Sequence, residues 1–552
     1  MKNVPLQERM ERRRTAWAAV LLFLFMLVLA FVPAWKAVAG LARGATIDLH
    51  RDEAFVRALL EGHYGEDPTY LGGGLWYTPL ITWLEAAATY LTGMPAAQAI
   101  VQLGPFANLL APVTFFIMCW YFLGPVRAVA ATAAYLFWAI GQEPGWVVAT
   151  YSHRLIPVSF SQSFFFLELI LIDKAFRKDR PWPSLAAGLG AGLTFLAHAG
   201  PAILAVLLIA LVTCVKLVVA YRRKNLPMAR GATIACLFAA GGFLAASLPL
   251  TWYLFKGSMQ VANREGFLFT YYALTLQHLG LLLYHNLTWY MLLAAAGFIL
   301  VVRRSALSGA SAHTRTLLLC WLMVAVALFV YSYAISVADS HLGISLPALL
   351  PTFHFYFYAS AVLSVFAGQA FVVALLRAWA WLHARHWARR SLARTDLAMG
   401  CFLVIALCCT LNYPAYATRR DVAVVRSRDL AFQADRLGAE AADRIHALVP
   451  WTGVVLCRKD LSIWPLLCTA RHVVATASTM GNPYLDQRKR EADNELLLQG
   501  MEQARTDTGP LLRAYKVSHL LVRPSELARM PEAPRWFPHE VFRNDSYILL
   551  AR

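Results

Sequence analysis

The chain has 552 residues, of which 59% are hydrophobic, and its mean hydropathy is +0.51. A composition this apolar excludes an ordinary soluble protein, in which about half of the residues are apolar. The formal charge of +18 comes from Lys and Arg that stand mostly in short runs between apolar segments, which is typical of membrane topology rather than of a nucleic-acid-binding face.

The N-terminus reads MKNVPLQERMERRR and is followed by an apolar run over residues 16–39. This run is too long for the hydrophobic region of a signal peptide, and no convincing cleavage site follows it. We therefore expect a retained signal anchor with its basic end in the cytoplasm.

Apolar runs long enough to cross a bilayer predict about eleven transmembrane helices. They cover residues 16–39, 99–123, 128–149, 156–172, 184–197, 201–220, 231–255, 279–302, 316–338, 351–376 and 397–414. With the N-terminus in the cytoplasm, Lys and Arg gather in the cytoplasmic segments and are sparse in the opposite loops, as the positive-inside rule requires. We expect a multi-pass α-helical domain over residues 1–416 in the cell inner (plasma) membrane.

The apolar run at residues 76–92 is not counted as a span, because counting it would invert the charge bias of every later loop. We interpret it as a partly embedded helix of a long first outer loop, residues 40–97.

From residue 417 to 552 the composition is that of a soluble domain, which the topology places outside the cytoplasm. Its alternating helical and β-branched segments predict a small α/β domain. The expected helices cover 432–449 and 486–504, and the expected strands cover 453–457, 472–476, 517–524 and 546–552. Cys457 and Cys468 either pair in an oxidising compartment or serve as small buried hydrophobic side chains.

The first outer loop is dense in acidic side chains just after the first span, with Asp48, Asp52 and Glu53 close together. A carboxylate at a membrane interface can act as a general base, because partial desolvation raises its basicity. The alternative is a structural one, in which Asp48 is the N-cap of a helix and the other two carboxylates lie in its first turn.

Basic side chains and histidines gather at the same face of the membrane in later loops and helix ends. The candidates are Arg154, His198, Lys256, Arg264 and His354, with His153 beside the first of them. Ionisable groups at that depth cost free energy and suit a lipid phosphate. The structural alternative for each is an ordinary interfacial side chain, which in the case of Lys256 extends its charged end toward water.

Four motifs in chain order resemble those of the C-type membrane glycosyltransferases (GT-C fold), which include protein O-mannosyltransferases and the lipid A aminoarabinose transferases. They are HRDEAF, LWYTPLITWLEAAATYLTG, LTFLAHAG and PTFHFYFYASAVLSVFAGQAF. The chain departs from this pattern at Thr78-Pro79, where the family has Pro-Pro, and at His354-Phe355, where relatives often have Arg-Phe.

The resemblance implies transfer of a sugar from a polyprenyl-phosphate-linked donor to a hydroxyl of a lipid, glycan or protein acceptor. Asp52 is then the first candidate for the base, with Glu53 and Asp48 as reserves. The donor phosphate is assigned to Arg154, Arg264, His198, His354 and Lys256, and contacts with the acceptor or sugar to His50, His63, Tyr77 and His153. No set of metal ligands and no nucleic-acid site is predicted, and assistance by a divalent cation stays open. The alternatives are a lipid or polysaccharide transporter or flippase, and a non-catalytic protein of envelope-glycan assembly.

Overall fold

The fold was analysed in a computed structural model of the chain. It describes residues 6–140, 151–178, 180–256, 280–281, 284–303, 310–344, 353–384, 394–477, 481–503 and 508–552. The chain forms two compact units that do not follow the chain order. Unit 1 holds Met1–Ala37, Gly104–Ser247 and Thr270–Val425, and unit 2 holds Val38–Leu103, Leu248–Phe269 and Arg426–Arg552.

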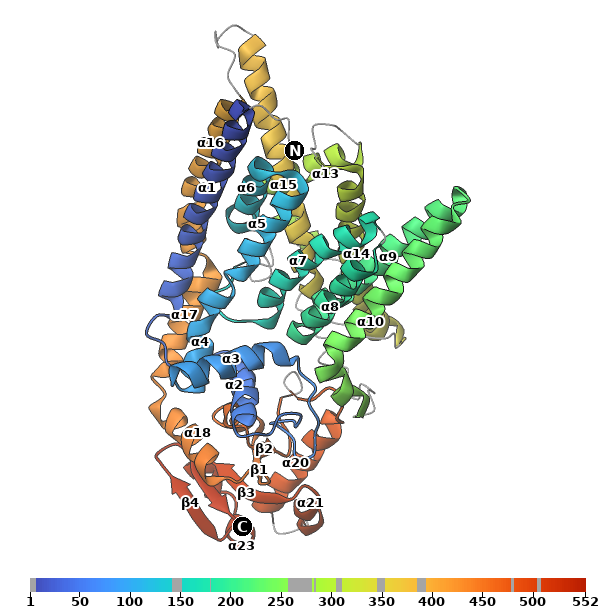
Figure 1. Cartoon of the computed structure of the whole chain (residues 1–552). Helices are drawn as coiled ribbons and strands as arrows, with labels where there is room; N and C mark the ends of the chain where they lie inside the picture. Colours follow the sequence, from blue (N-terminus) through green and yellow to red (C-terminus); the bar gives the residue numbers. More distant parts are fainter. Residues whose placement is uncertain are drawn as a thin grey trace. The chain divides into compact units, whose positions relative to one another are not determined.

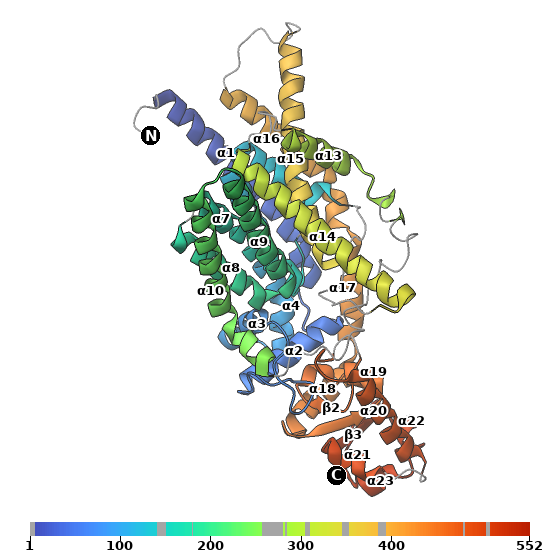
Figure 2. The same cartoon turned by 90° about the vertical axis from the view of Figure 1, so that its right-hand side faces the viewer.

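Unit 1 is built from helices (Figures 1 and 2). Its elements are α1 (Leu6–Val38), α5 (Leu110–Leu123), α6 (Pro125–Ala133), the π-helical turn η1 (Ala134–Trp138), α7 (Pro157–Lys178), α8 (Pro181–Ala197), α9 (Ala199–Arg222), α13 (Trp289–Val302), α14 (Ala312–Leu342), α15 (Phe353–Ala384) and α16 (Arg394–Ala417). The helices α10 (Leu226–Lys256) and α17 (Arg420–Gln433) run from unit 1 into unit 2. One continuous hydrophobic core joins the helices of unit 1, with Phe115, Trp321 and Phe366 fully buried in it.

Glycines let α8 and α10 approach closely. A Cβ atom on Gly188 would lie 1.9 Å from the backbone oxygen of Ala239, and one on Gly242 would lie 2.5 Å from that of Leu185. Since no real Cβ atom tolerates such contacts, the GLGAGLTF segment serves helix packing.

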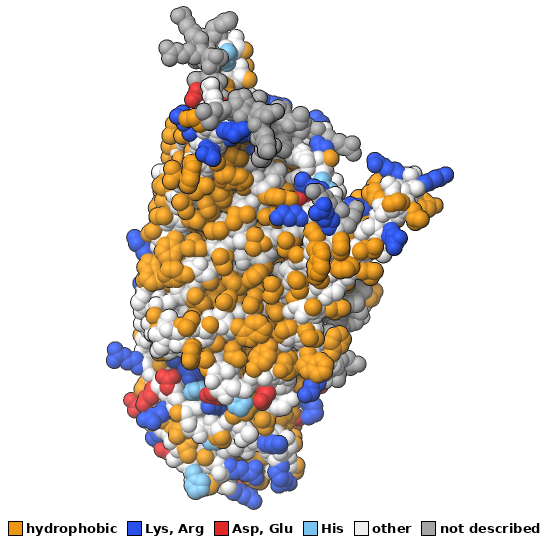
Figure 3. Space-filling view, viewed as in Figure 1, with side chains coloured by type: hydrophobic (Ala, Val, Ile, Leu, Met, Phe, Trp, Pro, Cys, Tyr) orange, Lys and Arg blue, Asp and Glu red, His pale blue; other side chains and the backbone are white. Residues whose placement is uncertain are grey.

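Seven helices among the described residues are long and apolar enough to span a membrane by length and composition. They are Gln7–Val38, Ala96–Leu123, Ala199–Arg222, Leu226–Lys256, Ala312–Tyr331, His354–Ala384 and Thr395–Gln433. Helices also lie at the other four predicted spans, but these are shorter or carry more charge. Residues 141–149 of one of these spans and residues 279 and 282–283 of another lie outside the described part. Figure 3 shows hydrophobic side chains over the visible face of these helices. The prediction of a multi-pass α-helical membrane protein is confirmed, while eleven remains the predicted number of spans.

Unit 2 contains the first outer loop, whose helices are α2 (Ile47–Leu60), α3 (Pro79–Thr92) and α4 (Ala96–Ala107), the last of which continues into unit 1. Pro79 fits the first position of α3 because its missing N–H would have no partner there, and Gly93 ends the helix in the left-handed conformation with φ of 68°. Helix α3 packs against α2 and occupies the segment that the charge bias excluded as a span.

The C-terminal part of unit 2 is an α/β sandwich around a five-stranded sheet of order β2-β1-β3-β5-β4. The strands are β1 (Val454–Cys457), β2 (His472–Val473), β3 (Val517–Val522), β4 (His539–Arg543) and β5 (Ile548–Ala551). The helical elements are α18 (Arg436–Leu448), α19 (Lys459–Ile463), η3 (Leu467–Thr469), α20 (Gln487–Glu502), α21 (Gly509–Ala514), α22 (Pro524–Leu527) and α23 (Ala533–Trp536). β1 pairs in parallel with β2 and β3, whereas β5 is antiparallel to β3 and β4.

The predicted helices and strands of this sheet domain are present, and one strand was missed. β4 has the sequence HEVFR and is mostly exposed, so it lacks the alternation of apolar residues that marks a half-buried strand. Cys457 and Cys468 are free and buried, which matches the second of the two interpretations of these residues.

Candidate functional site

Helix α2 presents the acidic side chains of the first outer loop. Its N-cap is Thr46 and the helix begins at Ile47, so Asp48 lies in the first turn and is not the cap. Asp52 and Glu53 lie beyond that first turn. Asp48 is therefore not the cap, although its first-turn position is one that the helix dipole favours, and the positions of Asp52 and Glu53 need another reason.

Arg51 is the centre of a buried polar cluster. Its Nε and Nη2 atoms donate to Asp52 Oδ1 at 3.1 and 2.9 Å. Nη2 also donates to Tyr77 Oη at 2.7 Å, and Nη1 lies 3.1 Å from Asp48 Oδ1. One cation thus joins three of the residues that the sequence singled out, and holds Asp52 in a fixed orientation.

Asp52 has one oxygen engaged by Arg51 and one oxygen, Oδ2, that has no hydrogen-bond partner among the described residues. The residue is 2% exposed. Burial raises the pKa of Asp52 to about 6, the charge of Arg51 opposes this rise, and the charge of Asp48 adds to it. A carboxylate with this pKa is mostly ionised at neutral pH and has the basicity that proton transfer requires.

Glu85 on α3 is a second buried carboxyl next to this cluster. It is 0% exposed, and neither of its oxygens has a partner within the described part of the chain. Burial raises the pKa of Glu85 well above its ordinary value, and the charge of Asp52 raises it further. Since two carboxylates in one buried site do not both ionise readily, the pair favours a single negative charge.

Glu85 was not among the predicted site residues, because the segment PLITWLEAAATYLT, in which it is the one acidic residue, was interpreted only as an apolar helix. That solitary position was itself a signal, since an ionisable side chain in an apolar helix is costly unless it has a role. Arg51 lay within HRDEAF and was overlooked in favour of its acidic neighbours.

Glu53 belongs to a different cluster of unit 2. Its Oε1 accepts hydrogen bonds from Arg57 Nη2 at 2.7 Å and Nε at 3.0 Å. Arg43 Nη2 lies 3.6 Å from the same oxygen, and both arginines pair with Asp443 of α18 at 3.3 and 3.5 Å. The carboxylate of Glu53 is therefore held by two cations on the other side of α2.

The two histidines of the first outer loop are both packed against aromatic rings. His50 is 3% exposed, bonds to Gly44 O at 2.9 Å, and packs against the rings of Phe432 and Trp464, each with centroids 5.1 Å away. Burial lowers the pKa of His50, so it is neutral at pH 7.

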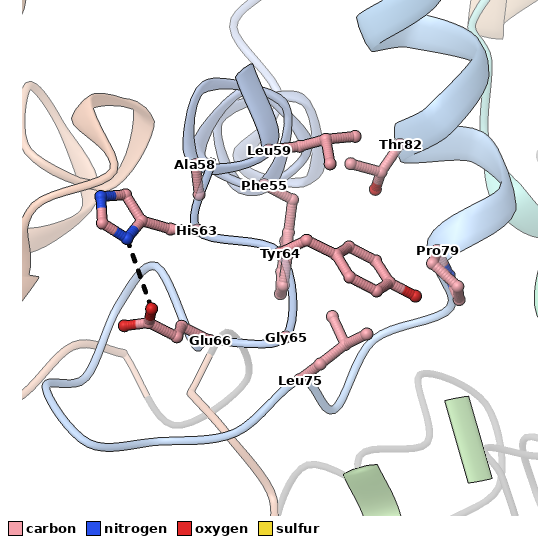
Figure 4. Close-up of a pocket in the computed structure, with 10 residues that line it drawn as sticks. All are labelled: Phe55, Ala58, Leu59, His63, Tyr64, Gly65, Glu66, Leu75, Pro79 and Thr82. Atoms are coloured by element: carbon pink, nitrogen blue, oxygen red, sulfur yellow. Dashed lines mark hydrogen bonds and ion pairs between the residues drawn. The ribbon is translucent and has the colours of Figure 1, made fainter. Parts of the chain in front are cut away.

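His63 stacks on Trp451 with ring centroids 3.9 Å apart and pairs with Glu66 at 3.3 Å. It lines a small pocket together with Tyr64, Leu75 and Pro79 (Figure 4). The cavity volume of about 10 Å³ accommodates a water molecule but not a sugar ring.

In unit 1, His153 and Arg154 lie in a buried segment before α7. They are 3% and 6% exposed, and Asn108 fixes the segment by donating to the carbonyl oxygens of Ser152 and Arg154 at 2.9 and 2.6 Å. In the described residues neither ring nitrogen of His153 has a hydrogen-bond partner.

His198 interrupts the helical path between α8 and α9, as the sequence predicted. Its backbone is extended, and its Nδ1 accepts a hydrogen bond from the N–H of Gly200 at 3.0 Å, which caps α9. The ring of His354 on α15 stacks on it with centroids 5.0 Å apart. Unit 1 thus brings together both histidines assigned to the donor phosphate.

Lys256 is the exposed last residue of α10 and lies in unit 2, while Arg264 lies outside the described residues. In the ranges that the structure describes, no three His, Cys, Asp or Glu side chains gather closely enough to hold a metal ion. The buried carboxyls near Arg51 are accordingly a pair and not a complete set of metal ligands.

Neither protein-family sequence models nor curated protein sequences match the chain. Solved structures do match. ArnT from Cupriavidus metallidurans, bound to undecaprenyl phosphate, superposes with a TM-score of 0.54 at 14% identity over 96% of this chain and 97% of the other. The oligosaccharyltransferase AglB from Archaeoglobus fulgidus, in complex with an inhibitory peptide and a dolichol-phosphate, gives 0.54 at 13% identity over 93% and 72%.

The chain has the GT-C fold. The resemblance that the four short motifs carried is thereby confirmed at the level of fold. Because the GT-C match to ArnT covers nearly all of both chains, it includes the first outer loop and the C-terminal sheet domain as well as the helices.

Proposed function

We propose that the chain is a glycosyltransferase that moves a sugar from a polyprenyl-phosphate-linked donor to an acceptor hydroxyl on the extracytoplasmic face of the membrane. The observation that carries this proposal is the buried Asp52, whose Oδ2 has no partner among the described residues and whose pKa is raised to about 6. Two neighbours in fold, ArnT and AglB, have structures with undecaprenyl phosphate and dolichol-phosphate.

Asp52 acts as the general base in this proposal. Its Oδ2 accepts the proton of the acceptor hydroxyl, the acceptor oxygen bonds to the anomeric carbon, and the bond from that carbon to the phosphate oxygen breaks. Arg51 keeps Oδ1 engaged, so that Oδ2 is the oxygen presented to the hydroxyl. The hydroxyl group of Tyr77 accepts a hydrogen bond from Nη2 of the same guanidinium and so helps to hold Arg51 in place.

The leaving group is a lipid phosphate, whose growing negative charge requires cations or hydrogen-bond donors. Arg154 and the stacked His198 and His354 are the proposed phosphate-binding residues of unit 1. Lys256 and Arg264 are proposed for the same task from the end of α10 and the segment that follows it.

The orientation in the membrane is part of the proposal. The bias of Lys and Arg places the N-terminus in the cytoplasm and the first outer loop outside. The packing of this loop with the C-terminal sheet domain inside unit 2 supports a common side for both, as the even number of predicted spans between them requires.

The experiment compares a deletion strain complemented with the wild type or with Asp52→Asn, using mass spectrometry of lipid-linked sugars and envelope glycans. We expect the lipid-linked donor to accumulate and one glycan modification to disappear in the deletion and in Asp52→Asn, with equal amounts of protein in the membrane. Asp545→Asn, an exposed carboxylate between β4 and β5, is the matched control and should restore the modification. Restoration by Asp52→Asn would refute the assignment of the base.

A further inference from the structure

The first outer loop supplies part of the core of the C-terminal sheet domain. Tyr70 is 0% exposed and packs in one hydrophobic cluster with residues such as Val455 and Leu549. Its hydroxyl donates to Gln487 Oε1 on α20. The N–H of Val473 in β2 donates to Thr69 O at 2.9 Å, so the loop also pairs with the edge of the sheet. The sheet domain and the loop therefore complete each other.

Helix α2 is attached to this domain near its middle. Glu53, which is 2% exposed, binds Arg57 and Arg43, and both arginines reach Asp443 on α18. The cluster has two cations and two carboxylates, so its charges balance. Because Asp52 and Glu53 are neighbours on the helix, this attachment lies one residue from the proposed base.

A second attachment lies at the C-terminal end of α2. Glu61 directly follows the helix and receives two hydrogen bonds from Arg471, at 2.9 and 3.2 Å, in the bidentate geometry that carboxylates and guanidinium groups favour. Arg471 is 8% exposed and also donates to the carbonyl oxygens of Val449 and His446, at 2.7 Å each. The guanidinium of Arg471 is thus held by the sheet domain independently of its hydrogen bonds to Glu61.

We propose that the C-terminal sheet domain is a brace for α2, and that Glu61, Arg471, Glu53 and Asp443 are positioning residues for Asp52. This inference rests on the proposed function of Asp52. A base must stay within a fraction of an ångström of its productive position, and a short helix does not hold such a position alone. The brace fixes α2 at two points, while Arg51 orients the carboxylate itself.

The test uses the full-length protein with Glu61→Gln, which removes the charge on the α2 side of the bidentate pair. The matched control is Glu502→Gln within the sheet domain, because Glu502 is exposed to the same degree as Glu61, 30% against 29%, and bonds to Arg458 at 2.7 Å. Hydrogen exchange measured by mass spectrometry should be at least several-fold faster in α2 for Glu61→Gln and unchanged for Glu502→Gln. Asp443→Asn should have the same effect as Glu61→Gln.

The second readout is the pH profile of sugar transfer, with lipid-linked donor extracted from the deletion strain as the probe. A loosened α2 admits water to Asp52, so the acidic limb of kcat/KM should move below pH 6 and kcat should fall, which loss of protein alone would not produce. Unchanged exchange in α2 would overturn the brace. Faster exchange with an unchanged pH profile and kcat would overturn the positioning role. Full activity of Asp52→Asn would instead refute the proposed base, and this outcome is separate because the exchange measurement needs no catalysis.

Discussion

The ionisation of Asp52 should set the acidic limb of activity. Burial moves the pKa of this carboxyl from 3.8 to about 6, which corresponds to a cost of about 3 kcal/mol for ionising it in the folded protein. With a pKa of about 6, about nine tenths of the enzyme carries the ionised base at pH 7 and about one tenth at pH 5. We therefore expect kcat/KM to fall about tenfold between these two pH values.

Two substitutions should move this limb in opposite directions. Arg51→Gln removes the cation that favours the ionised carboxylate, so the pKa of Asp52 and the acidic limb should rise above 6. Asp48→Asn removes a negative charge that disfavours ionisation, so both should fall. Asp545→Asn changes the net charge by the same amount as Asp48→Asn and should leave the limb in place.

The assay measures initial rates of transfer by the purified full-length protein between pH 4.5 and 8, in steps of about half a pH unit that resolve a tenfold change in rate. The free energy of unfolding should change with pH in the opposite direction to activity. The raised pKa of Asp52 stabilises the folded state most below about pH 4, and this contribution is lost as the pH rises through 6. If the pH of the acidic limb is unchanged by Arg51→Gln and Asp48→Asn, or shifts in the same direction in both variants, the role of Asp52 ionisation is refuted. Complete loss of activity in Asp48→Asn at every pH would move the base to Asp48.

Three further predictions concern the fold. Gly242→Ala places a Cβ atom 2.5 Å from a backbone oxygen of α8 and should destabilise the detergent-solubilised protein by about 1–3 kcal/mol, whereas Gly241→Ala, with no atom within 4 Å among the described residues, should not lower the melting temperature. Tyr70→Ala leaves a cavity in the core of the sheet domain and should cost about 3–5 kcal/mol, seen as faster hydrogen exchange in β1 and β3; unchanged exchange there would contradict the shared core. Cys457 and Cys468 are free and buried, and burial raises the pKa of both thiols, so they should react with a thiol reagent only after denaturation and show no disulfide on non-reducing gels.

Much of the fold could be predicted because a bilayer demands long apolar helices and leaves a strong pattern in the sequence. The break at His198 was predicted because it separates two apolar runs, and the acidic segment because its charges begin where the first apolar run ends. β4 was not, because its side chains are exposed on a sheet edge and carry no apolar alternation.

The roles within the acidic segment were harder to predict, because they depend on partners far away in the chain. Asp52 and Glu53 are adjacent and chemically similar, yet one faces Arg51 and Glu85 while the other binds arginines that also reach Asp443. Asp443 carries no local signal in the sequence, and Glu85 stands out only as the one acidic residue of an apolar segment. The sequence thus supported a carboxylate base in this loop, and the three-dimensional contacts separate the candidates.

The central claim is that this chain breaks the bond between a sugar and a lipid phosphate, with Asp52 as the base. The most direct measurement incubates the purified full-length protein in vesicles with lipid-linked sugar and an acceptor extract from the deletion strain, and quantifies free polyprenyl phosphate and glycosylated acceptor together. The account predicts equal amounts of both products with the wild type and neither with Asp52→Asn. Movement of intact lipid-linked sugar across the vesicle membrane without release of polyprenyl phosphate would contradict it.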